Sequence, residues 1–283
     1  MHKAHRFVVI ILVSIFLFDG YLWFRIFSLS HGETKVYFFD VGQGDSGLVV
    51  LPNNVQLLID GGRDAAVLSN LSRVMDPTDR TIEMLMMTHP DTDHFGGLID
   101  VLERYHVALF LGTGRIADSE VYQRLHDVLI ERNIPYLFLQ EGDLFSYGDV
   151  VFTVLGPSSQ ELLSDATNDT SLVVLMQKGE KRVLFTADIG FQNEERLVRD
   201  YDLSADILKI AHHGSRFSTS DAFLAELQPS LAVINVGENR YGHPHADVLD
   251  RLSTYSIPFY RTDQDGIVEI DFTEDSFRVF TQN

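Results

Sequence analysis

The sequence predicts a single layered α/β domain that follows an N-terminal apolar segment. Short β-type runs alternate with helical patterns from residue 35 onward, and no linker or low-complexity stretch interrupts them. The 283 residues are 45% hydrophobic and 22% charged, which is a globular profile. We therefore expect residues 1–30 to form a membrane anchor or signal segment and residues 35–283 to form one domain.

The first part of the domain is predicted to start with a three-stranded meander and to continue with alternating strands and helices. Gly, Asp, Asn and Pro residues mark the turns between them. The expected strands are 35–41, 47–51, 55–60, 83–87 and 107–111, and the expected helices are 65–74, 96–105 and 119–132.

The second part of the chain repeats this style. Its expected strands are 136–139, 150–155, 171–177, 182–186, 206–211, 231–236, 258–261 and 266–272, and its expected helices are 192–199, 221–227 and 246–254. Because the two parts look alike and no linker separates them, one domain is favoured over two.

Composition limits the possible chemistry. The chain has no cysteine, so disulfides, thiolate zinc sites and a cysteine nucleophile are excluded, and any metal site must use His, Asp and Glu. A formal net charge of −19 argues against a broad basic groove for DNA. It does not exclude a nucleic-acid substrate, since bound divalent cations can invert the local field.

The N-terminus carries a targeting signal. Lys3 and Arg6 precede an apolar run over 7–18, and after Asp19 the apolar character continues to residue 24. As one helix, 7–24 is about 27 Å long, close to the thickness of a bilayer core. The alternative is a cleaved secretory signal with its cleavage site at 28–30. Both interpretations place the domain outside the cytoplasm, as a single-pass membrane protein or a secreted one.

Six of the eleven histidines fall in three tight groups, each just after an expected strand. Loops at strand ends present functional side chains in α/β folds, which favours a site over core packing. The three groups are His89 with His94, His212 with His213, and His243 with His245.

The segment from Thr88 to His94 is the centre of the expected site. Its two histidines and two aspartates have no basic partner in the sequence nearby and would repel one another unless a cation lay among them. The alternative is an acidic turn before a helix that begins near Gly96, with Asp93 as the N-cap. Asp60 and Asp188 also end apolar strands, although each could simply form a turn.

These segments resemble the metallo-β-lactamase superfamily. Thr88 to His94 is similar to its T-H-x-H-x-D-H signature, with Asp91 in place of the second histidine. Taken with the other segments, the resemblance extends to the extracytoplasmic hydrolase-like domain of ComEC-type competence proteins and runs from about residue 37 to 272. The other segments that carry it are 39–46, 59–62, 168–174, 185–188, 212–215 and 241–245.

The resemblance implies a four-layer αββα sandwich with two divalent metal ions, Zn²⁺ or Mn²⁺, at one edge of the paired sheets. It implies that His89 and Asp91 bind the first metal, that Asp93 and His94 bind the second, and that Asp188 bridges them. We expect His212, in preference to His213, to complete the second site. The complete set of expected metal ligands is His89, Asp91, Asp93, His94, Asp169, Asp188 and His212.

Further residues are expected to support the metals or to bind substrate. Asp93, Asp188 and His243 are the expected catalytic residues, and Asp60 is expected to orient a ligand. Lys209, Ser215 and His245 could bind phosphate, whereas Lys209 could also be packed structurally and one late histidine could only brace the other. The full supporting set is Asp45, Asp60, Asn168, Lys209, His213, Ser215 and His245.

The sequence departs from the superfamily pattern at Asp91 and at the third motif, which offers only Asn168 and Asp169. The first site would then be rich in oxygen ligands, which makes Mn²⁺ or Mg²⁺ competitive with Zn²⁺. The function predicted is a phosphodiesterase or nuclease that acts on DNA beside a separate transporter. The alternatives are an envelope phosphoester hydrolase of the choline-phosphate type and a non-catalytic metal-binding module, and the oligomeric state stays open.

Overall fold

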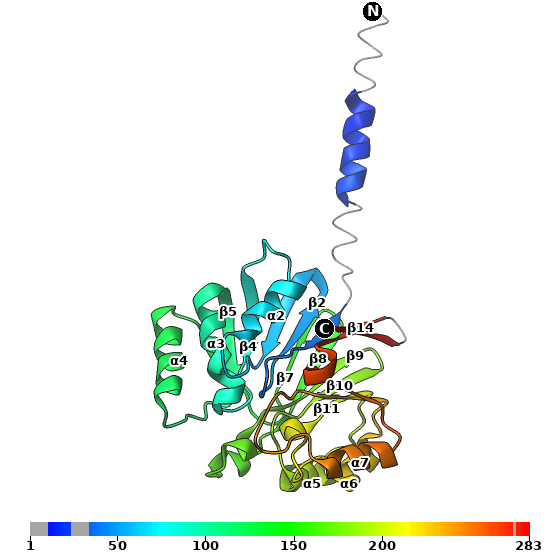
Figure 1. Cartoon of the computed structure of the whole chain (residues 1–283). Helices are drawn as coiled ribbons and strands as arrows, with labels where there is room; N and C mark the ends of the chain where they lie inside the picture. The colour runs from blue at the N-terminus through cyan, green and yellow to red at the C-terminus, as the bar shows by residue number, and fades with distance from the viewer. Residues whose placement is uncertain (1–10, 24–33, 274–275) are drawn as a thin grey trace, which may run out of the picture.

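The computed structural model describes residues 11–23, 34–273 and 276–283. From Thr34 onward, two β-sheets pack face to face and helices cover their outer faces (Figure 1). This is the αββα arrangement expected from the sequence, and the expected two-sheet sandwich is confirmed.

The first sheet joins both ends of the domain. Its strand order is β15-β14-β1-β2-β3-β4-β5-β6. Strands β1 to β3 form the expected antiparallel meander, and β3 to β6 run parallel because helices connect them. The strands are β1 Lys35–Phe38, β2 Gly47–Leu51, β3 Val55–Ile59, β4 Thr81–Met86, β5 His106–Gly112, β6 Tyr136–Phe138, β14 Ile267–Phe272 and β15 Phe277–Gln282.

The second sheet has the same plan, with the order β13-β12-β11-β10-β9-β8-β7. Strands β7 to β10 are antiparallel neighbours, and β10 to β13 run parallel. The strands are β7 Leu144–Tyr147, β8 Val150–Gly156, β9 Val173–Lys178, β10 Lys181–Phe185, β11 Ile207–Lys209, β12 Leu231–Ile234 and β13 Phe259–Arg261.

Helices cover one face of each sheet. The first sheet carries α2 Ala66–Val74, α3 Thr92–Arg104 and α4 Glu120–Glu131, and the second carries α5 Phe191–Asp200, α6 Asp221–Leu227 and α7 Ala246–Thr254. Serine side chains cap two of these helices: Ser119 accepts from Tyr122 N at 3.1 Å, and Ser220 accepts from Phe223 N at 3.3 Å.

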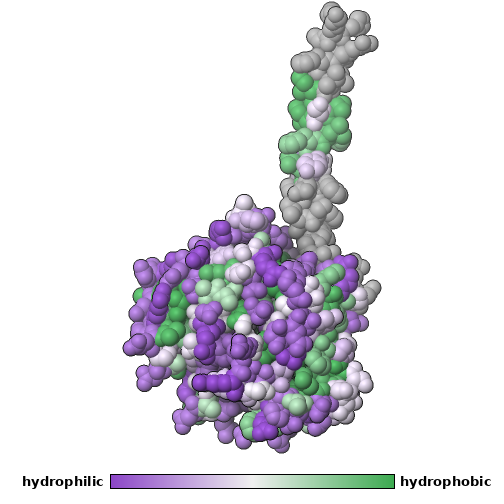
Figure 2. Space-filling model, in the orientation of Figure 1, coloured by the Kyte–Doolittle hydropathy of each residue, from purple (hydrophilic) through white to green (hydrophobic). Residues whose placement is uncertain are grey.

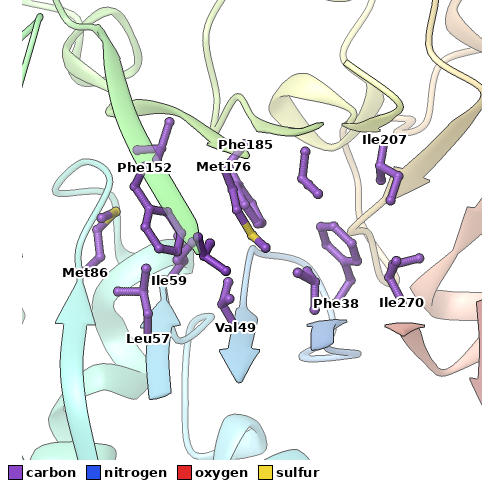
Figure 3. Close-up of a cluster of buried hydrophobic side chains, with 14 of the residues drawn as sticks. Phe38, Val49, Leu57, Ile59, Met86, Phe152, Met176, Phe185, Ile207 and Ile270 are labelled. Atoms are coloured by element: carbon purple, nitrogen blue, oxygen red, sulfur yellow. The ribbon is translucent and has the colours of Figure 1, made fainter. Parts of the chain in front are cut away.

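The central core lies between the sheets. Phe38, Val49 and Ile59 of the first sheet face Phe152 and Phe185 of the second sheet (Figure 3). The alternation of side chains along each strand sends the remaining apolar residues to the two outer cores beneath the helices. The parallel strands are therefore buried on both faces, and their polar residues gather at the strand ends.

Some element boundaries differ from the sequence expectation. Helix α3 begins at Thr92 instead of Gly96, because the amides of His94 and Phe95 already donate to Asp91 O at 2.9 and 3.1 Å. Asp91, not Asp93, therefore occupies the N-cap position. The expectation also missed β7 and β15, which are edge strands, and the short elements η1 Pro52–Asn54, η2 Glu161–Leu163, η3 Thr167–Thr170, η4 Ala211–Gly214 and α8 Thr262–Asp265.

Residues 11–23 are helical, and their exposed side chains are mostly apolar (Figure 2). Among the described residues, no helix has both the length and the apolar character needed to span a bilayer. The basic residues before the apolar run and the alternative cleavage site at 28–30 lie outside the described residues.

Candidate metal centre

The histidine and aspartate side chains expected in the site come together where the parallel strands of both sheets end. Asp60 directly follows β3, and His89 lies three residues after β4. In the second sheet, Asp188 follows β10 and His213 follows β11. Since parallel strands present their carboxyl ends at one edge of a sheet, the two sheets bring these groups to a common edge.

Asp60 orients both histidines of the first sheet. Its Oδ2 lies 2.8 Å from His94 Nδ1 and accepts from Thr88 Oγ1 at 2.7 Å, and Thr88 Oγ1 lies 3.1 Å from His89 Nδ1. The carboxylate accepts from His94, and the Thr88 hydroxyl, already donating to Asp60, accepts from His89. Both imidazoles therefore donate through Nδ1 and direct Nε2, the nitrogen that a metal ion would bind, into the site.

His213 is oriented in the same way by a different group. Its Nδ1 lies 3.0 Å from the backbone carbonyl of Asn235 and 3.2 Å from Asp45 Oδ1. The Asn235 side chain donates to the carbonyls of Phe39 and Ser46 at 3.3 and 3.2 Å, which ties this strand end to the loop that carries Asp45. A third imidazole therefore presents Nε2 to the site.

The backbone around these groups is unusual. Asp60, Ala187, His212 and His213 all have positive φ values, between 46° and 57°. Such a conformation is uncommon for residues other than glycine and often occurs at functional sites. It turns the chain sharply after each strand and aims the side chains at the opposite sheet.

Several buried atoms of the site have no hydrogen-bond partner among the described residues. They are the Nε2 atoms of His89, His94 and His213, and Asp188 Oδ1. Buried polar atoms are rarely left unsatisfied, and imidazole nitrogens beside a carboxylate are common metal ligands. The residues present therefore fit a divalent cation.

The spacing defines overlapping groups that could hold such ions. His89, His94 and Asp188 have ligand atoms within 4.8 Å of one another, and so do Asp93, His94 and His213. Asp188 lies 3.3 Å from both His94 Nε2 and His213 Nε2, so this carboxylate touches both groups. Two further groups of the same size contain Asp45, with Asp60 and His94 or with Asp188 and His213.

The electrostatics of the site favour a positive charge. Burial raises the pKa of Asp188, but His213 and His94 outweigh this effect and hold the pKa well below its usual range. Burial lowers the pKa of His213, but Asp188 and Asp45 raise it well above its usual value. Protons on these imidazoles thus balance the carboxylates, and a divalent cation that displaced the Nε2 protons would supply the positive charge in their place.

Lys209 belongs to the buried floor of the site. Its side chain is almost fully enclosed, and its ammonium group contacts Asp45 and donates to the carbonyl of Ala187 at 2.9 Å. Burial raises the pKa of Asp45, but Lys209 and His213 outweigh this and lower it. This placement fits the structural packing alternative better than the expected contact with a substrate phosphate.

His212, the expected second-sheet ligand, lies farther from the carboxylates than His213 does. His212 Nε2 lies 3.7 Å from Asp188 Oδ2, but its side chain is partly exposed and belongs to none of the groups described above. His213 occupies the buried position between the carboxylates. The local reason is the turn at η4, which gives the two residues different directions.

Other expected residues lie at the margin of the site. Asp91 is partly exposed, with Oδ2 3.7 Å from His89 Nε2, and the Asn168 side chain lies 3.4 Å from His212 Nδ1. Asp169 turns instead to Ser164, whose hydroxyl donates to it at 2.6 Å. Ser215 is buried in the turn and accepts from Phe217 N at 3.3 Å, so neither of these two residues is brought to the cluster.

The two late histidines have different environments. The His243 ring centre lies 5.5 Å from that of His212 and 6.5 Å from that of His213, and burial together with these neighbours lowers its pKa to about 4. His243 is therefore neutral at neutral pH in this arrangement. His245 instead caps α7, where its Nδ1 accepts from Asp247 N at 3.2 Å.

Sequence reasoning missed two asparagines that organise the site. Asn235 ends an apolar strand, which is the same signal that identified Asp60 and Asp188. Asn239 bonds the loop that carries His243: its side chain donates to His243 O at 2.8 Å and accepts from the amides of Tyr241 and His243, both at 3.0 Å. Asn239 lies five residues after the end of β12, where the sequence gave no such signal.

The sandwich and its edge cluster are those of metal-dependent hydrolases. The family model of the metallo-β-lactamase superfamily matches residues 39–237, so this chain belongs to that superfamily. Among solved structures, the metallo-β-lactamase-fold protein YhfI from Bacillus subtilis is similar, with a TM-score of 0.58 and 13% identity over 84% of this chain and 100% of that chain. At this identity, the likeness concerns the fold.

The curated relatives include competence proteins. ComE operon protein 3 of Bacillus subtilis is 31% identical over 86% of this chain, and competence protein ComA of Neisseria gonorrhoeae is 29% identical over 90%. The matches cover 34% and 35% of those proteins, so the chain spans about a third of the length of the relatives it matches. The expected resemblance to competence proteins is thereby confirmed.

Proposed function

We propose that this protein is a metal-dependent phosphodiesterase that hydrolyses DNA outside the cytoplasm during competence-type uptake. The observation that carries the proposal is the convergence of three imidazole Nε2 atoms around Asp188 at the common edge of the two sheets. The similarity to competence proteins supports DNA as the substrate.

The proposed cofactors are two divalent cations, Zn²⁺ or Mn²⁺. Their ligands would come from His89, His94, Asp93, Asp188 and His213, with Asp91 at the open side. When bound, such ions lower the pKa of a coordinated water toward ~7 and stabilise the attacking and leaving oxygens of a phosphodiester. No nucleophile from the protein is then needed.

The protein's own residues would position the reacting groups. Asp60 and Thr88 fix the imidazoles of His89 and His94, and Asn235 fixes that of His213. His243, neutral and half-buried beside His212, can offer an N–H to a phosphate oxygen. Lys209 would neutralise Asp45 beneath the site rather than touch substrate.

An extracytoplasmic location is proposed from the charge pattern of the N-terminus, with membrane attachment or secretion as the two forms. The chain would then act beside a separate DNA transporter. Fractionation of the producing cells, with protease added outside, would distinguish an external domain from an internal one.

The test is hydrolysis by the full-length chain with Zn²⁺ or Mn²⁺ over single-stranded DNA, double-stranded DNA and a small phosphodiester. We expect metal-dependent cleavage that Asp93→Ala and Asp188→Ala abolish. Asp127→Asn, an exposed residue of α4, is the matched control and should retain the activity. Unchanged hydrolysis in both alanine variants would refute the proposal.

The alternatives give different results when a choline-phosphate ester is added to the same assay. Hydrolysis restricted to choline-phosphate esters would identify an envelope phosphoester hydrolase. Stoichiometric metal binding without hydrolysis of any ester would identify a non-catalytic metal-binding module.

A further inference from the structure

A cavity adjoins the metal centre on the side of His243. Its volume is about 660 Å³, and its walls come from three loops. Each of these loops also carries a residue of the site: Asp45, Asp60 or His243 lies two to four residues from a residue of the cavity wall. A ligand held against Tyr241 would therefore lie beside His243, whose ring centre is 5.8 Å from that of Tyr241. The residues of the wall are Val41, Gly42, Gln43, Arg63, Asp64, Glu238, Asn239, Arg240 and Tyr241.

Tyr241 offers an exposed planar surface in the cavity wall. Its side chain is 58% exposed, its ring centre lies 5.8 Å from that of His243, and the Arg240 guanidinium lies 5.8 Å from its centroid. Asn239 holds the loop in this conformation through its hydrogen bonds to Tyr241 N and His243 N. The position of this aromatic surface relative to the site is therefore fixed.

Two arginines of the cavity have no carboxylate partner among the described residues. Arg63 and Arg240 form no salt bridge, although the chain has 41 acidic residues and 22 basic ones. Asp64 and Glu238 also line the cavity, so its net charge is close to zero. Binding there would depend on short-range contacts from planar guanidinium groups and on stacking, not on a strong positive field.

We infer that this cavity is a subsite for one unpaired nucleotide next to the scissile phosphodiester. The nucleobase stacks on the Tyr241–Arg240 surface, and the phosphates contact Arg63 and Arg240. A paired base keeps both faces inside the duplex stack, so the subsite favours single strands. The inference rests on the proposed function, since it concerns the substrate of the same site.

The test measures binding, so that it does not depend on catalysis. The full-length chain is titrated with a nuclease-resistant phosphorothioate oligothymidine and with an abasic phosphorothioate strand of equal length, both followed by fluorescence anisotropy. Stacking on one aromatic side chain should make the base-containing strand bind about tenfold tighter. Tyr241→Ala should abolish this preference, and Tyr241→Phe should retain it.

Phe280→Ala is the matched control, because Phe280 is also exposed and has Arg278 5.9 Å from its ring, but lies on the edge strand β15. It should leave the preference unchanged. Equal binding of the two strands by the wild type, or a preference that survives Tyr241→Ala, would overturn the inference.

The phosphate contacts are tested separately. Arg63→Gln and Arg240→Gln should each weaken the binding of both strands and reduce the slope of log K against log salt by about 0.7. Arg104→Gln, an exposed arginine at the far end of α3, should change neither quantity. Unchanged salt slopes in both variants would show that neither arginine contacts a phosphate, which would overturn this part of the inference.

Hydrolysis of a base-free small phosphodiester by the wild type reports on the proposed function alone. A preference for bases without any hydrolysis would reject the proposed function and leave the subsite intact. Hydrolysis without a preference for bases would support the proposed function and reject the subsite.

Discussion

The two sheets contribute to the metal centre in different ways. In the first sheet, His89 and His94 lie in one short segment, and a single buried carboxylate, Asp60, orients both. In the second sheet, Asp188 and His213 come from separate loops, and His213 is held by a backbone carbonyl. The two histidines of the first half of the centre, in the first sheet, therefore come from one short stretch of sequence. The second half, in the second sheet, depends on how separate strands are assembled.

The largest expected effect comes from the residue that joins the two halves. Asp188 contacts His94, His213 and Lys209. Asp188→Asn therefore removes a negative charge that lies beside side chains of both sheets. We expect more than about a 100-fold loss of phosphodiesterase activity, a larger effect than is typical of an outer-shell carboxylate, together with weaker metal binding. Metal analysis and initial rates measure both, with Asp127→Asn as the control.

The second half is tested by comparing neighbouring histidines. His213→Gln should lower metal affinity by about 100-fold, because it removes a buried nitrogen that faces the site, whereas His212→Gln should lower it by less than about tenfold. Competition with a chromophoric chelator measures the two affinities. A larger loss of metal affinity in His212→Gln than in His213→Gln would favour His212 as the ligand.

The first half is tested at its orienting group. Asp60→Asn should weaken metal binding by roughly 10 to 100-fold, since the amide holds the His94 ring less well and can present the wrong tautomer. The same chelator competition applies. An unchanged affinity would mean that the two imidazoles are positioned by packing alone.

The smallest expected effect concerns the loop that carries Asn168. Burial raises the pKa of Glu161, but hydrogen bonds from Ser158 N, Arg196 and Asn193 outweigh this and lower it below 4.5. The ionised carboxylate therefore stabilises the fold above the unfolded pKa, and this contribution is lost as pH falls through the folded pKa.

Glu161→Gln should accordingly cost about 1 to 2 kcal/mol of unfolding free energy near neutral pH. The difference from wild type should shrink as pH falls below about 4.5, the usual value for this group. Urea unfolding at several pH values measures it, and Glu195→Gln, an exposed residue of α5, is the control. A cost that does not change with pH would contradict the electrostatic explanation.

The same comparison explains what the sequence could predict. The layered α/β fold and the strand ends followed from hydrophobic patterns, since parallel strands buried on both faces read as apolar runs. The segment from Thr88 to His94 was recognisable because its charges have no local partners. Even there, α3 was predicted to begin near Gly96 instead of at Thr92. Aspartates are common both as metal ligands and at the start of a helix, so the sequence does not separate the two roles.

The preference between His212 and His213 could not be predicted in this way. Both residues follow the same strand, and their directions depend on two successive left-handed residues that no local pattern specifies. The support from Asn235 arises only when β12 lies beside β11 and the loop after β1 packs against it. Such contacts depend on the assembled sheets and not on residue spacing.

The pairing of β1 with β14 also determines when the first sheet can finish folding. Lys35 lies opposite Asp271 in this ladder, so one edge of the first strand finds its partner more than 230 residues later. During synthesis, that edge stays open until almost the whole domain has emerged. Early chaperone binding to residues 35–38 would protect it, and the assembled centre can form only as the last strands arrive.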